Sequence, residues 1–420
     1  MLDLKFILEN TEIIEKNSKD RGAIIHLAEI GALYEDKKKM ASKIDDLRSQ
    51  RNTISKQKPS EDDITLARKL NCEIKQMDAI LEDLGQKLNE FVCDVPNLTH
   101  PDSPRGGESD FKEIYRNKEV VKFDFVPKDH DDLMNAHDLI DFARGAKVAG
   151  SKFYFIKNQM VRLNQALLNY GLDICEKHGY TLMETPDMVK SAILAGSGFN
   201  PRGEEKQTYE IKNTDLDLVG TAEITILGFH SDEVLNLNQG PIKYAALSHC
   251  YRTEAGSYGK ATKGLYRVHQ FAKLEMFVFC RPQESEDIHQ EILSIEKEIV
   301  DGLEIPYRVI DIATGDLGAP AYRKYDLEAW MTMKGDGKKK QGDYGEITSA
   351  SNCTDYQARR LNIKYKEEDG KMKYVHTLNG TAVVLSRFPI ALIENHQQAD
   401  GSIVIPPALK KYIGFEKIAI

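Results

Sequence analysis

Two runs of regularly spaced apolar residues in the first hundred positions constrain the fold more than any other feature. Each run repeats at alternating intervals of three and four residues, the spacing of a coiled-coil seam. Only the short polar segment 57–63 separates the runs, and its Ser60 precedes three acidic residues, as at a helix start. We therefore predict an antiparallel hairpin, whose first helix over 30–57 would be roughly 42 Å long at about 1.5 Å per residue. The seams are Ile30, Leu33, Lys37, Met40, Ile44, Leu47, Arg51 and Ile54, and then Leu70, Ile74, Met77, Leu81, Leu84, Leu88 and Phe91.

The first of these helices is strongly basic. Between Lys37 and Lys58 there are eight cationic residues and two anionic ones, a net charge of +6. Such a run is commonly a solvated coiled-coil face. A basic helix that extends from the chain as an arm also suits the backbone of an RNA. The charge pattern alone leaves both interpretations open.

The chain as a whole is acidic, with a formal net charge of −9 over 420 residues. Any nucleic-acid-binding surface must therefore be local. The six cysteines form no Cys-x-x-Cys pair, which indicates a reducing compartment and no structural zinc site. No run approaches the roughly 20 apolar residues that span a bilayer, and the N-terminus lacks the order of a signal peptide. We expect a cytoplasmic protein with no membrane partner.

A segment rich in proline and glycine, 95–107, separates the hairpin from the rest of the chain. We place a domain boundary near residue 105, which gives two domains, 1–105 and 106–420. Beyond the boundary, strand-like runs alternate with short helices. Neither G-x-G-x-x-G after a strand nor G-x-x-x-x-G-K-[ST] occurs, so a nucleotide would need a site of another design.

The stretch 251–279 holds the densest candidate chemistry. It predicts two extended runs around a loop rich in glycine and lysine. Arg252 and Glu254 are two residues apart, so on a strand they would face the same side, while Arg267 and Glu275 add charge to the second run. Guanidinium groups bind phosphates and carboxylates, and carboxylates bind ammonium groups or a metal. A solvated hairpin with surface ion pairs is the plainer interpretation, and composition alone favours it.

Three further segments place polar groups beside apolar runs. Residues 221–223 fit a helix N-terminus with an acid in the first turn. Glu346 and Ser349 stand three residues apart, as at a surface strand end. The third segment runs from Leu378 to Arg387.

Residues 251–275 resemble motif 2 of class II aminoacyl-tRNA synthetases, in the form that seryl-tRNA synthetases carry. Segments 160–186 and 378–402 resemble motifs 1 and 3, and the hairpin resembles the family's tRNA-binding arm. The motif 2 matches are Arg252, Glu254, Ala255, Gly256, Thr262, Gly264, Arg267, His269, Gln270, Phe271, Lys273 and Glu275. The departures are Tyr251, Lys260, Ala261 and Lys263 in motif 2, and Ala382 and Ser386, which replace glycines in motif 3.

This resemblance covers nearly the whole chain and implies its architecture and activity. It implies an α+β fold, with an antiparallel helical coiled-coil arm followed by a catalytic domain whose mainly antiparallel sheet is flanked by helices. It implies a homodimer formed through motif 1. The implied activity is that of an ATP-dependent serine–tRNA ligase, with Mg²⁺. Serine is activated as seryl-adenylate and then passed to the 3′-terminal ribose of tRNA(Ser), and of tRNA(Sec) as well.

The resemblance also assigns roles to individual residues. It makes Arg252 and Arg387 the catalytic pair at the ATP phosphates, and it gives Mg²⁺ to Glu346 and Ser349, an oxygen-donor pair suited to that ion. The ATP-binding set is Arg252, Thr253, Glu254, Val268, His269, Gln270, Phe271, Glu346, Ile347, Thr348, Ser349 and Arg387. The serine-binding set is Thr221, Ala222, Glu223, Arg252, Glu275, Asn379 and Thr381, and the tRNA-binding set is Lys43, Arg48, Arg51 and Lys56.

Two other functions compete with this one. One is a synthetase paralogue that binds RNA or a carrier without aminoacylating tRNA. The other is a coiled-coil scaffold, which would need no catalytic groups. The intact arm and arginines argue against the first. The large motif-rich region outside the coiled coil argues against the second.

Overall fold

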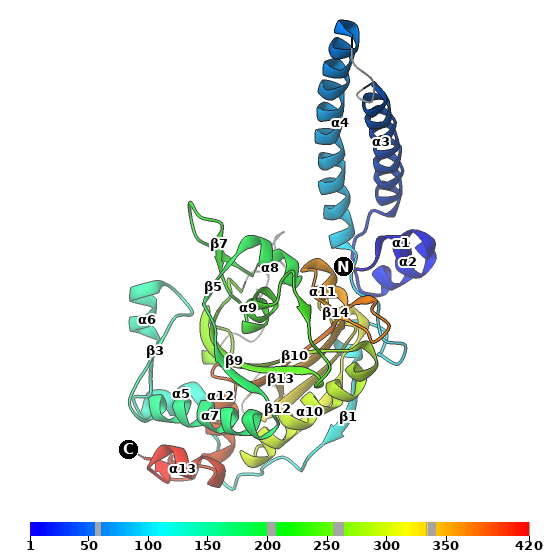
Figure 1. Cartoon of the computed structure of the whole chain (residues 1–420). Helices are drawn as coiled ribbons and strands as arrows, with labels where there is room; N and C mark the ends of the chain where they lie inside the picture. Colours follow the sequence, from blue (N-terminus) through cyan, green and yellow to red (C-terminus); the bar gives the residue numbers. More distant parts are fainter. Residues whose placement is uncertain (55–59, 200–206, 255–263, 333, 335–341, 420) are drawn as a thin grey trace. The chain divides into compact units, whose positions relative to one another are not determined.

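The structure, a computed structural model, describes residues 1–54, 60–199, 207–254, 264–332, 334 and 342–419. It consists of two compact units, Met1–Leu98 and Thr99–Ile420, and Figure 1 traces the chain through both.

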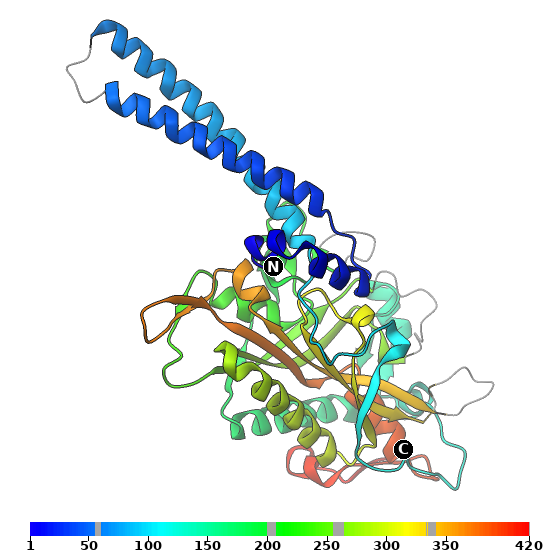
Figure 2. The same ribbon diagram turned by 90° about the vertical axis from the view of Figure 1, so that its right-hand side faces the viewer.

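Helices are the only regular secondary structure among the described residues of the first unit. Short helices α1 (Leu4–Glu9) and α2 (Thr11–Asp20) precede the long helices α3 (Leu27–Ile54) and α4 (Glu61–Asp94). Helices α3 and α4 lie side by side in both views (Figures 1 and 2). The predicted hairpin is confirmed, because its core is built from the predicted seam. The buried members of that core are Ile44, Leu47, Leu70, Ile74 and Met77.

The start of α4 follows the expected capping pattern. The backbone amide of Asp63 donates to Oγ of Ser60 at 3.2 Å, and the amide of Ser60 donates to Oδ2 of Asp63 at 2.9 Å. These reciprocal bonds satisfy backbone donors that a helix start otherwise leaves unpaired.

The second unit is built on one eight-stranded sheet. Every neighbouring pair in it is antiparallel except β9 with β4, so the predicted mainly antiparallel sheet is confirmed. In spatial order the strands are β1 (Lys112–Arg116), β11 (Tyr307–Asp311), β12 (Arg323–Met331), β13 (Asp343–Thr354), β16 (His376–Val384), β10 (Gln270–Cys280), β9 (Ile242–Tyr251) and β4 (Thr181–Glu184).

Alternation along β10 separates the two faces of this sheet. Leu274, Met276 and Val278 join the large core formed with helices α7 (Gln159–Lys177) and α10 (Ser285–Gly302). Phe277 and Phe279 pack on the other side, in a second core that includes residues of α9 (Ala222–Phe229) and α11 (Tyr356–Arg360). Because side chains alternate along a strand, Glu275 faces the same side as Phe277, away from α7 and α10.

The remaining elements are short. No helix in the described part of the chain is both long and apolar enough to cross a membrane. The helices are α5 (His130–Ala136), α6 (Phe142–Ala149), α8 (Ser191–Ser197), α12 (Phe388–His396) and α13 (Lys410–Ile413), with the 3₁₀ turns η1 (Glu108–Asp110), η2 (Gly264–Tyr266), η3 (Pro282–Glu284), η4 (Thr314–Asp316) and η5 (Pro407–Leu409). The strands are β2 (Ile140–Asp141), β3 (Phe155–Ile156), β5 (Met188–Lys190), β6 (Tyr209–Glu210), β7 (Leu216–Leu218), β8 (Val234–Leu235), β14 (Lys364–Lys366), β15 (Met372–Tyr374), β17 (Ile403–Val404) and β18 (Lys417–Ile418).

Candidate active site

A β-bulge in β13 brings Glu346 and Ser349 to one face of the sheet. In a regular strand, residues three apart face opposite sides. Here Glu346 pairs with Glu328 of β12 and Ser349 pairs with Asp326, and Ile347 is the extra residue that the bulge inserts. Since Asp326 and Glu328 are two apart on β12 and share a face, their partners on β13 share it too.

Cations surround the Glu346 carboxylate. Burial raises its pKa, but the positive charges of Arg387 and Lys324, with those of Arg252 and Arg267, outweigh burial, and the net pKa lies below its usual range. Glu346 is therefore an anion in a cationic setting.

The acidic neighbour of Ser349, Asp326, behaves differently. Burial raises the pKa of Asp326 to about 7, although Lys324 and Ser349 oppose this. Its Oδ1 is buried and has no hydrogen-bond partner among the described residues. An ionised carboxylate, a hydroxyl and an unpartnered carboxyl oxygen on one face suit a hard divalent cation. Among the described residues there is no group of three or more His, Cys, Asp or Glu side chains arranged for a metal, so phosphate oxygens would have to complete such a site.

Arg252 lies immediately after β9, which ends at Tyr251. Its Nε donates to the carbonyl of Gly220 at 3.2 Å, and its guanidinium carbon lies 5.4 Å from the centre of the Phe271 ring. Its backbone amide donates to the carbonyl of His269 at 3.0 Å, and the ring Nδ1 of His269 donates to the carbonyl of Arg252 at 2.9 Å. These contacts fix the arginine beside Phe271, an aromatic residue of the predicted ATP-binding set.

Glu254 differs from the expectation that it shares a strand face with Arg252. The strand has already ended, and Glu254 has a φ of 52°, in the left-handed region. Its Oε2 accepts from Nη1 of Arg267 at 3.1 Å. The motif 2 charges are therefore held by a local turn and an ion pair, and alternation along a strand does not set their direction.

Arg387, at the start of α12, contacts β13 directly. Its Nη1 donates to the backbone carbonyl of Glu346 at 2.8 Å, and its guanidinium carbon lies 3.8 Å from the centre of the Tyr266 ring. The structure thus brings Arg387 and Glu346 together, as the predicted phosphate site requires.

A cluster of buried polar groups surrounds Glu275 of β10. Oγ1 of Thr381 donates to Oε2 of Glu275 at 3.3 Å, and Lys273 forms an ion pair with the same oxygen. Lys273 and Glu275 are 7% and 2% exposed, so this pair lies in a low-dielectric setting. Asn379, also buried, donates from Nδ2 to Sγ of Cys353 at 3.8 Å.

Glu223 lies near the same cluster of polar groups. Thr221 is the N-cap of α9, as predicted, and its Oγ1 accepts from the amide of Glu223 at 3.4 Å. Nε2 of Gln357 donates to the Glu223 carboxyl at 2.5 Å. Burial raises the pKa of Glu223 to about 7 despite that hydrogen bond, and the nearby Glu275 adds to the rise.

Several predicted site residues lie apart from this face. Thr348 points to the opposite side of the sheet, where its Oγ1 donates to Oε2 of Glu296 on α10 at 2.8 Å. Ile347 and Val268 are buried in the large core. Thr348, Ile347 and Val268 could therefore contact ATP on this face only through backbone atoms. Ala222 is also fully buried, while Thr253 and Gln270 lie at the ends of the β9–β10 pair.

The predicted tRNA-binding residues lie on α3, except Lys56, which is outside the described residues. Lys43 is exposed. Arg48 forms an ion pair with Asp78 at 3.0 Å, and Arg51 donates from Nη1 to Asn71 at 3.3 Å. Arg48 and Arg51 therefore already have partners on α4, whereas Lys43 is exposed to solvent.

Sequence analysis assigned no site role to Lys273, Gln357, Lys324 or Asp326. Gln357 contacts Glu223 from another element. Lys273 and Lys324 each form an ion pair two residues along their own strand, with Glu275 and Asp326. The sequence did indicate a partner for Lys273, because a lysine that is buried within an apolar strand needs an anion beside it.

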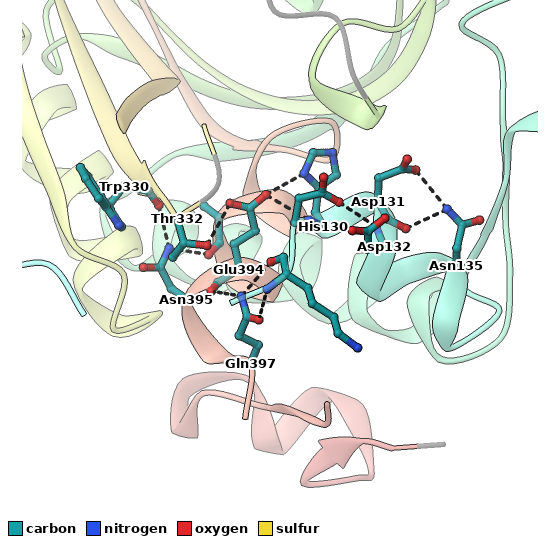
Figure 3. Close-up of polar contacts among 12 residues, drawn as sticks. His130, Asp131, Asp132, Asn135, Trp330, Thr332, Glu394, Asn395 and Gln397 are labelled. Atoms are coloured by element: carbon teal, nitrogen blue, oxygen red, sulfur yellow. Dashed lines mark hydrogen bonds and ion pairs between the residues drawn. The ribbon is translucent and has the colours of Figure 1, made fainter. Parts of the chain in front are cut away.

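Figure 3 shows a second polar cluster, which joins α5, β12 and α12. Nδ1 of His130 lies 2.8 Å from Oε1 of Glu394, which also accepts from the His130 amide at 3.1 Å, and Thr332 donates to Oε2 of Glu394 at 3.4 Å. A β-carbon at Gly264 would lie 2.1 Å from Nε2 of His130, so the chain passes close to this ring where it enters η2. The cluster therefore braces the start of the second motif 2 run, and it requires glycine at 264.

Comparison with known proteins identifies similar chains along the full length. A family model of the seryl-tRNA synthetase N-terminal domain matches residues 1–99, and a model of the tRNA synthetase class II core domain (G, H, P, S and T) matches residues 208–396. The serine–tRNA ligase of Treponema denticola is 51% identical, with 100% of both chains covered, and that of Rubrobacter xylanophilus is 47% identical, covering 100% of this chain and 99% of the other.

Solved structures give the same result. The seryl-tRNA synthetase of Pyrococcus horikoshii, complexed with ATP, superposes with a TM-score of 0.88 at 38% identity, over 100% of this chain and 99% of that one. The cytoplasmic enzyme of Naegleria fowleri, in complex with AMP, gives a TM-score of 0.86 at 29% identity, with the same coverage.

Proposed function

The chain belongs to the seryl-tRNA synthetase family of ATP-dependent ligases, and on that premise we propose how its residues activate serine and charge tRNA. In the first step the serine carboxylate attacks the α-phosphate of ATP, giving seryl-adenylate and pyrophosphate. In the second, the terminal ribose hydroxyl of the tRNA takes the seryl group and AMP leaves. One observation carries the proposal. The Glu275–Thr381 cluster and the Glu346–Ser349 pair lie on the same face of one sheet, the face opposite α10.

The proposed roles follow from the charge of each group. Arg252 holds the serine carboxylate against the α-phosphate, and Arg387 faces the γ-phosphate. Glu223 and Glu275 receive the serine ammonium group, with Lys273 offsetting one of the two carboxylates. Catalysis is positioning and charge neutralisation, and no side chain acts as a nucleophile.

Glu346 and Ser349 are the proposed Mg²⁺ ligands. Their shared face, the ionised state of Glu346 and the unpartnered oxygen of Asp326 support that assignment. A Mg²⁺ ion held there would neutralise charge on the ATP phosphates.

The remaining proposals concern partners and place. We assign tRNA(Ser) binding, and tRNA(Sec) binding with it, to the domain 1–105 and the chemistry to 106–420. A homodimer formed through motif 1 is supported by β4, which is the last strand in the sheet order and leaves Leu182 40% exposed. A cytoplasmic location is supported by six cysteines that are all free thiols.

Serine-dependent exchange of labelled pyrophosphate into ATP tests the proposed function. We expect exchange that requires serine and divalent cation, followed by aminoacylation of tRNA(Ser). Exchange without aminoacylation of any tRNA would favour the carrier-charging paralogue. No exchange at all would favour the RNA-binding paralogue or the scaffold.

Thr381→Val should narrow the preference for serine over alanine. The Thr381 hydroxyl contacts Glu275, so the two form a polar surface that alanine would leave unpaired. Sites built around a substrate hydroxyl reject the analogue that lacks it by about 10⁴. We expect the ratio of kcat/KM values for serine and alanine to fall by roughly tenfold or more in exchange assays. An unchanged ratio would mean that other groups recognise the serine hydroxyl.

Serine binding should depend on pH through Glu223. Its pKa of about 7 means that the carboxyl is neutral at pH 6 and charged at pH 8, and only the charged form attracts the serine ammonium group. We expect KM for serine to fall as pH rises from 6 to 8, and calorimetry at pH 6.5 to show proton release on serine binding. Glu223→Gln should abolish the proton release. Proton release that persists in this variant would assign the titration to another group.

A further inference from the structure

The sheet opens at the place where the two proposed substrate sites begin. Strands β13 and β16 pair from Thr354–Thr377 to Ala350–Gly380, and the pairing stops there. If the ladder continued, Ser349 would lie opposite Thr381. These are the first residues beyond the last pair. One belongs to the proposed metal site and the other to the proposed serine site.

Strands that separate leave backbone groups without ladder partners, and buried groups of this kind need another partner. Helix α10 places a carboxyl group beneath the sheet at this opening. Its Glu296 is 0% exposed, and its Oε2 accepts from Oγ1 of Thr348 on β13 at 2.8 Å. On the other strand, a β-carbon at Gly380 would lie 3.0 Å from Oε1 of Glu296, so the carboxyl lies directly under β16.

The electrostatic setting of Glu296 fits a neutral bridging group. Burial raises its pKa well above the usual range, and the hydrogen bond from the Thr348 hydroxyl partly opposes this. Its other oxygen, Oε1, is buried and accepts no hydrogen bond from the described residues. A neutral carboxylic acid can bond to Thr348 of β13 and face β16 at Gly380 without a counter-ion.

Helix α10 offers an internal comparison. His289, also 0% exposed, donates from Nε2 to the carbonyl of Ala350 at 2.9 Å. This bond lies under the last paired position of the ladder, whereas Glu296 lies under the opening. The same helix therefore bonds to β13 both where the sheet is closed and where it is open.

We infer that Glu296 is a positioning residue that sets the separation of β13 and β16, and thereby the placement of Thr381 relative to Ser349. The inference rests on the proposed assignment of the serine and metal sites. It gives Thr348 a role beneath the sheet, as the hydroxyl that anchors β13 to α10.

The test compares two substitutions of Glu296 in the full-length enzyme. Glu296→Gln keeps a neutral group that can both accept and donate, so KM for serine should stay within about twofold of wild type. Glu296→Leu leaves the Thr348 hydroxyl unpaired and removes the carboxyl from beneath Gly380, so KM for serine should rise at least about tenfold in pyrophosphate exchange. His289→Leu is the matched control, and it should lower Tm without moving KM for serine.

The outcomes separate a positioning role from a structural one. Wild-type KM for serine in folded Glu296→Leu would overturn the inference, and so would an equal rise in KM for His289→Leu at equal loss of Tm. If Glu296→Leu does not fold, Thr348→Val decides, with a several-fold rise in KM for serine expected and an unchanged value overturning the inference. A wild-type enzyme without serine-dependent exchange would instead refute the proposed function.

Discussion

Arg252→Ala is expected to lower serine-dependent pyrophosphate exchange by about 10³-fold or more. Arg252 is the cation that the structure fixes beside Phe271, through its bond to the Gly220 carbonyl and the backbone pair with His269. A preorganised donor aimed at charge that develops in the transition state is worth several kcal/mol, because the site excludes water. The loss should fall mainly on kcat, since the interaction strengthens as the α-phosphate is attacked.

The fold should survive this substitution. The truncated side chain loses one hydrogen bond to a backbone carbonyl, worth about 1 kcal/mol. Arg281→Ala is the matched control, because Arg281 follows β10 at the opposite end of the β9–β10 pair and bonds only weakly to Asn238, at 3.4 Å. Exchange near the wild-type rate in Arg252→Ala, or an equal loss in Arg281→Ala, would remove Arg252 from the mechanism.

The sequence predicted local structure better than the assembly of strands. The hairpin was predictable because heptad spacing is a property of residues close together in the sequence. Seam residues such as Ile44 and Ile74 are buried, as that spacing predicts. The presence of an antiparallel sheet came from the resemblance. The order of its strands depends on pairings between distant segments, which no local pattern encodes.

Strand β13 shows why the proposed metal site was only partly predictable from the sequence. The spacing of Glu346 and Ser349 places them on opposite faces of a regular strand, and only the bulge at Ile347 unites them. The resemblance paired these residues without a physical reason, and the register supplies one. The same bulge turns Thr348 toward α10, although the sequence grouped it with its neighbours as an ATP ligand.

The structure shows how motif 3 accommodates alanine at one of its two replaced glycines. Ala382 stands where the family has glycine, and it is the extra residue in a bulge of β16 between the pairs Glu275–Thr381 and Leu274–Val383. It is fully buried in the large core, so its methyl group is accommodated there. Gly380 is the position with no room, because a β-carbon there would lie 2.3 Å from Ile292. Close packing against α10 therefore constrains 380 and tolerates alanine at 382.

Removing residues 30–92 and bridging the gap should abolish most aminoacylation and leave pyrophosphate exchange intact. The hairpin has its own core, and the second unit, Thr99–Ile420, contains every proposed serine and ATP group. The truncated enzyme should therefore fold and form adenylate. It should charge tRNA poorly, because the basic face of α3 is gone. Loss of exchange in a folded truncation would show that the arm supports the active site.

Salt dependence identifies the contacts that the truncation removes. Each phosphate that a cation neutralises contributes about 0.7–0.9 to the slope of log affinity against log salt. Replacing Lys43, Arg48 and Arg51 by glutamine should therefore lower the slope for tRNA by about 2 to 3 units. Lys43→Gln should have the largest single effect, since Arg48 is already paired with Asp78. The matched control replaces the exposed Lys366, Lys371 and Lys373 by glutamine and should leave the slope unchanged. Equal slopes in the two triple variants would contradict RNA binding through α3.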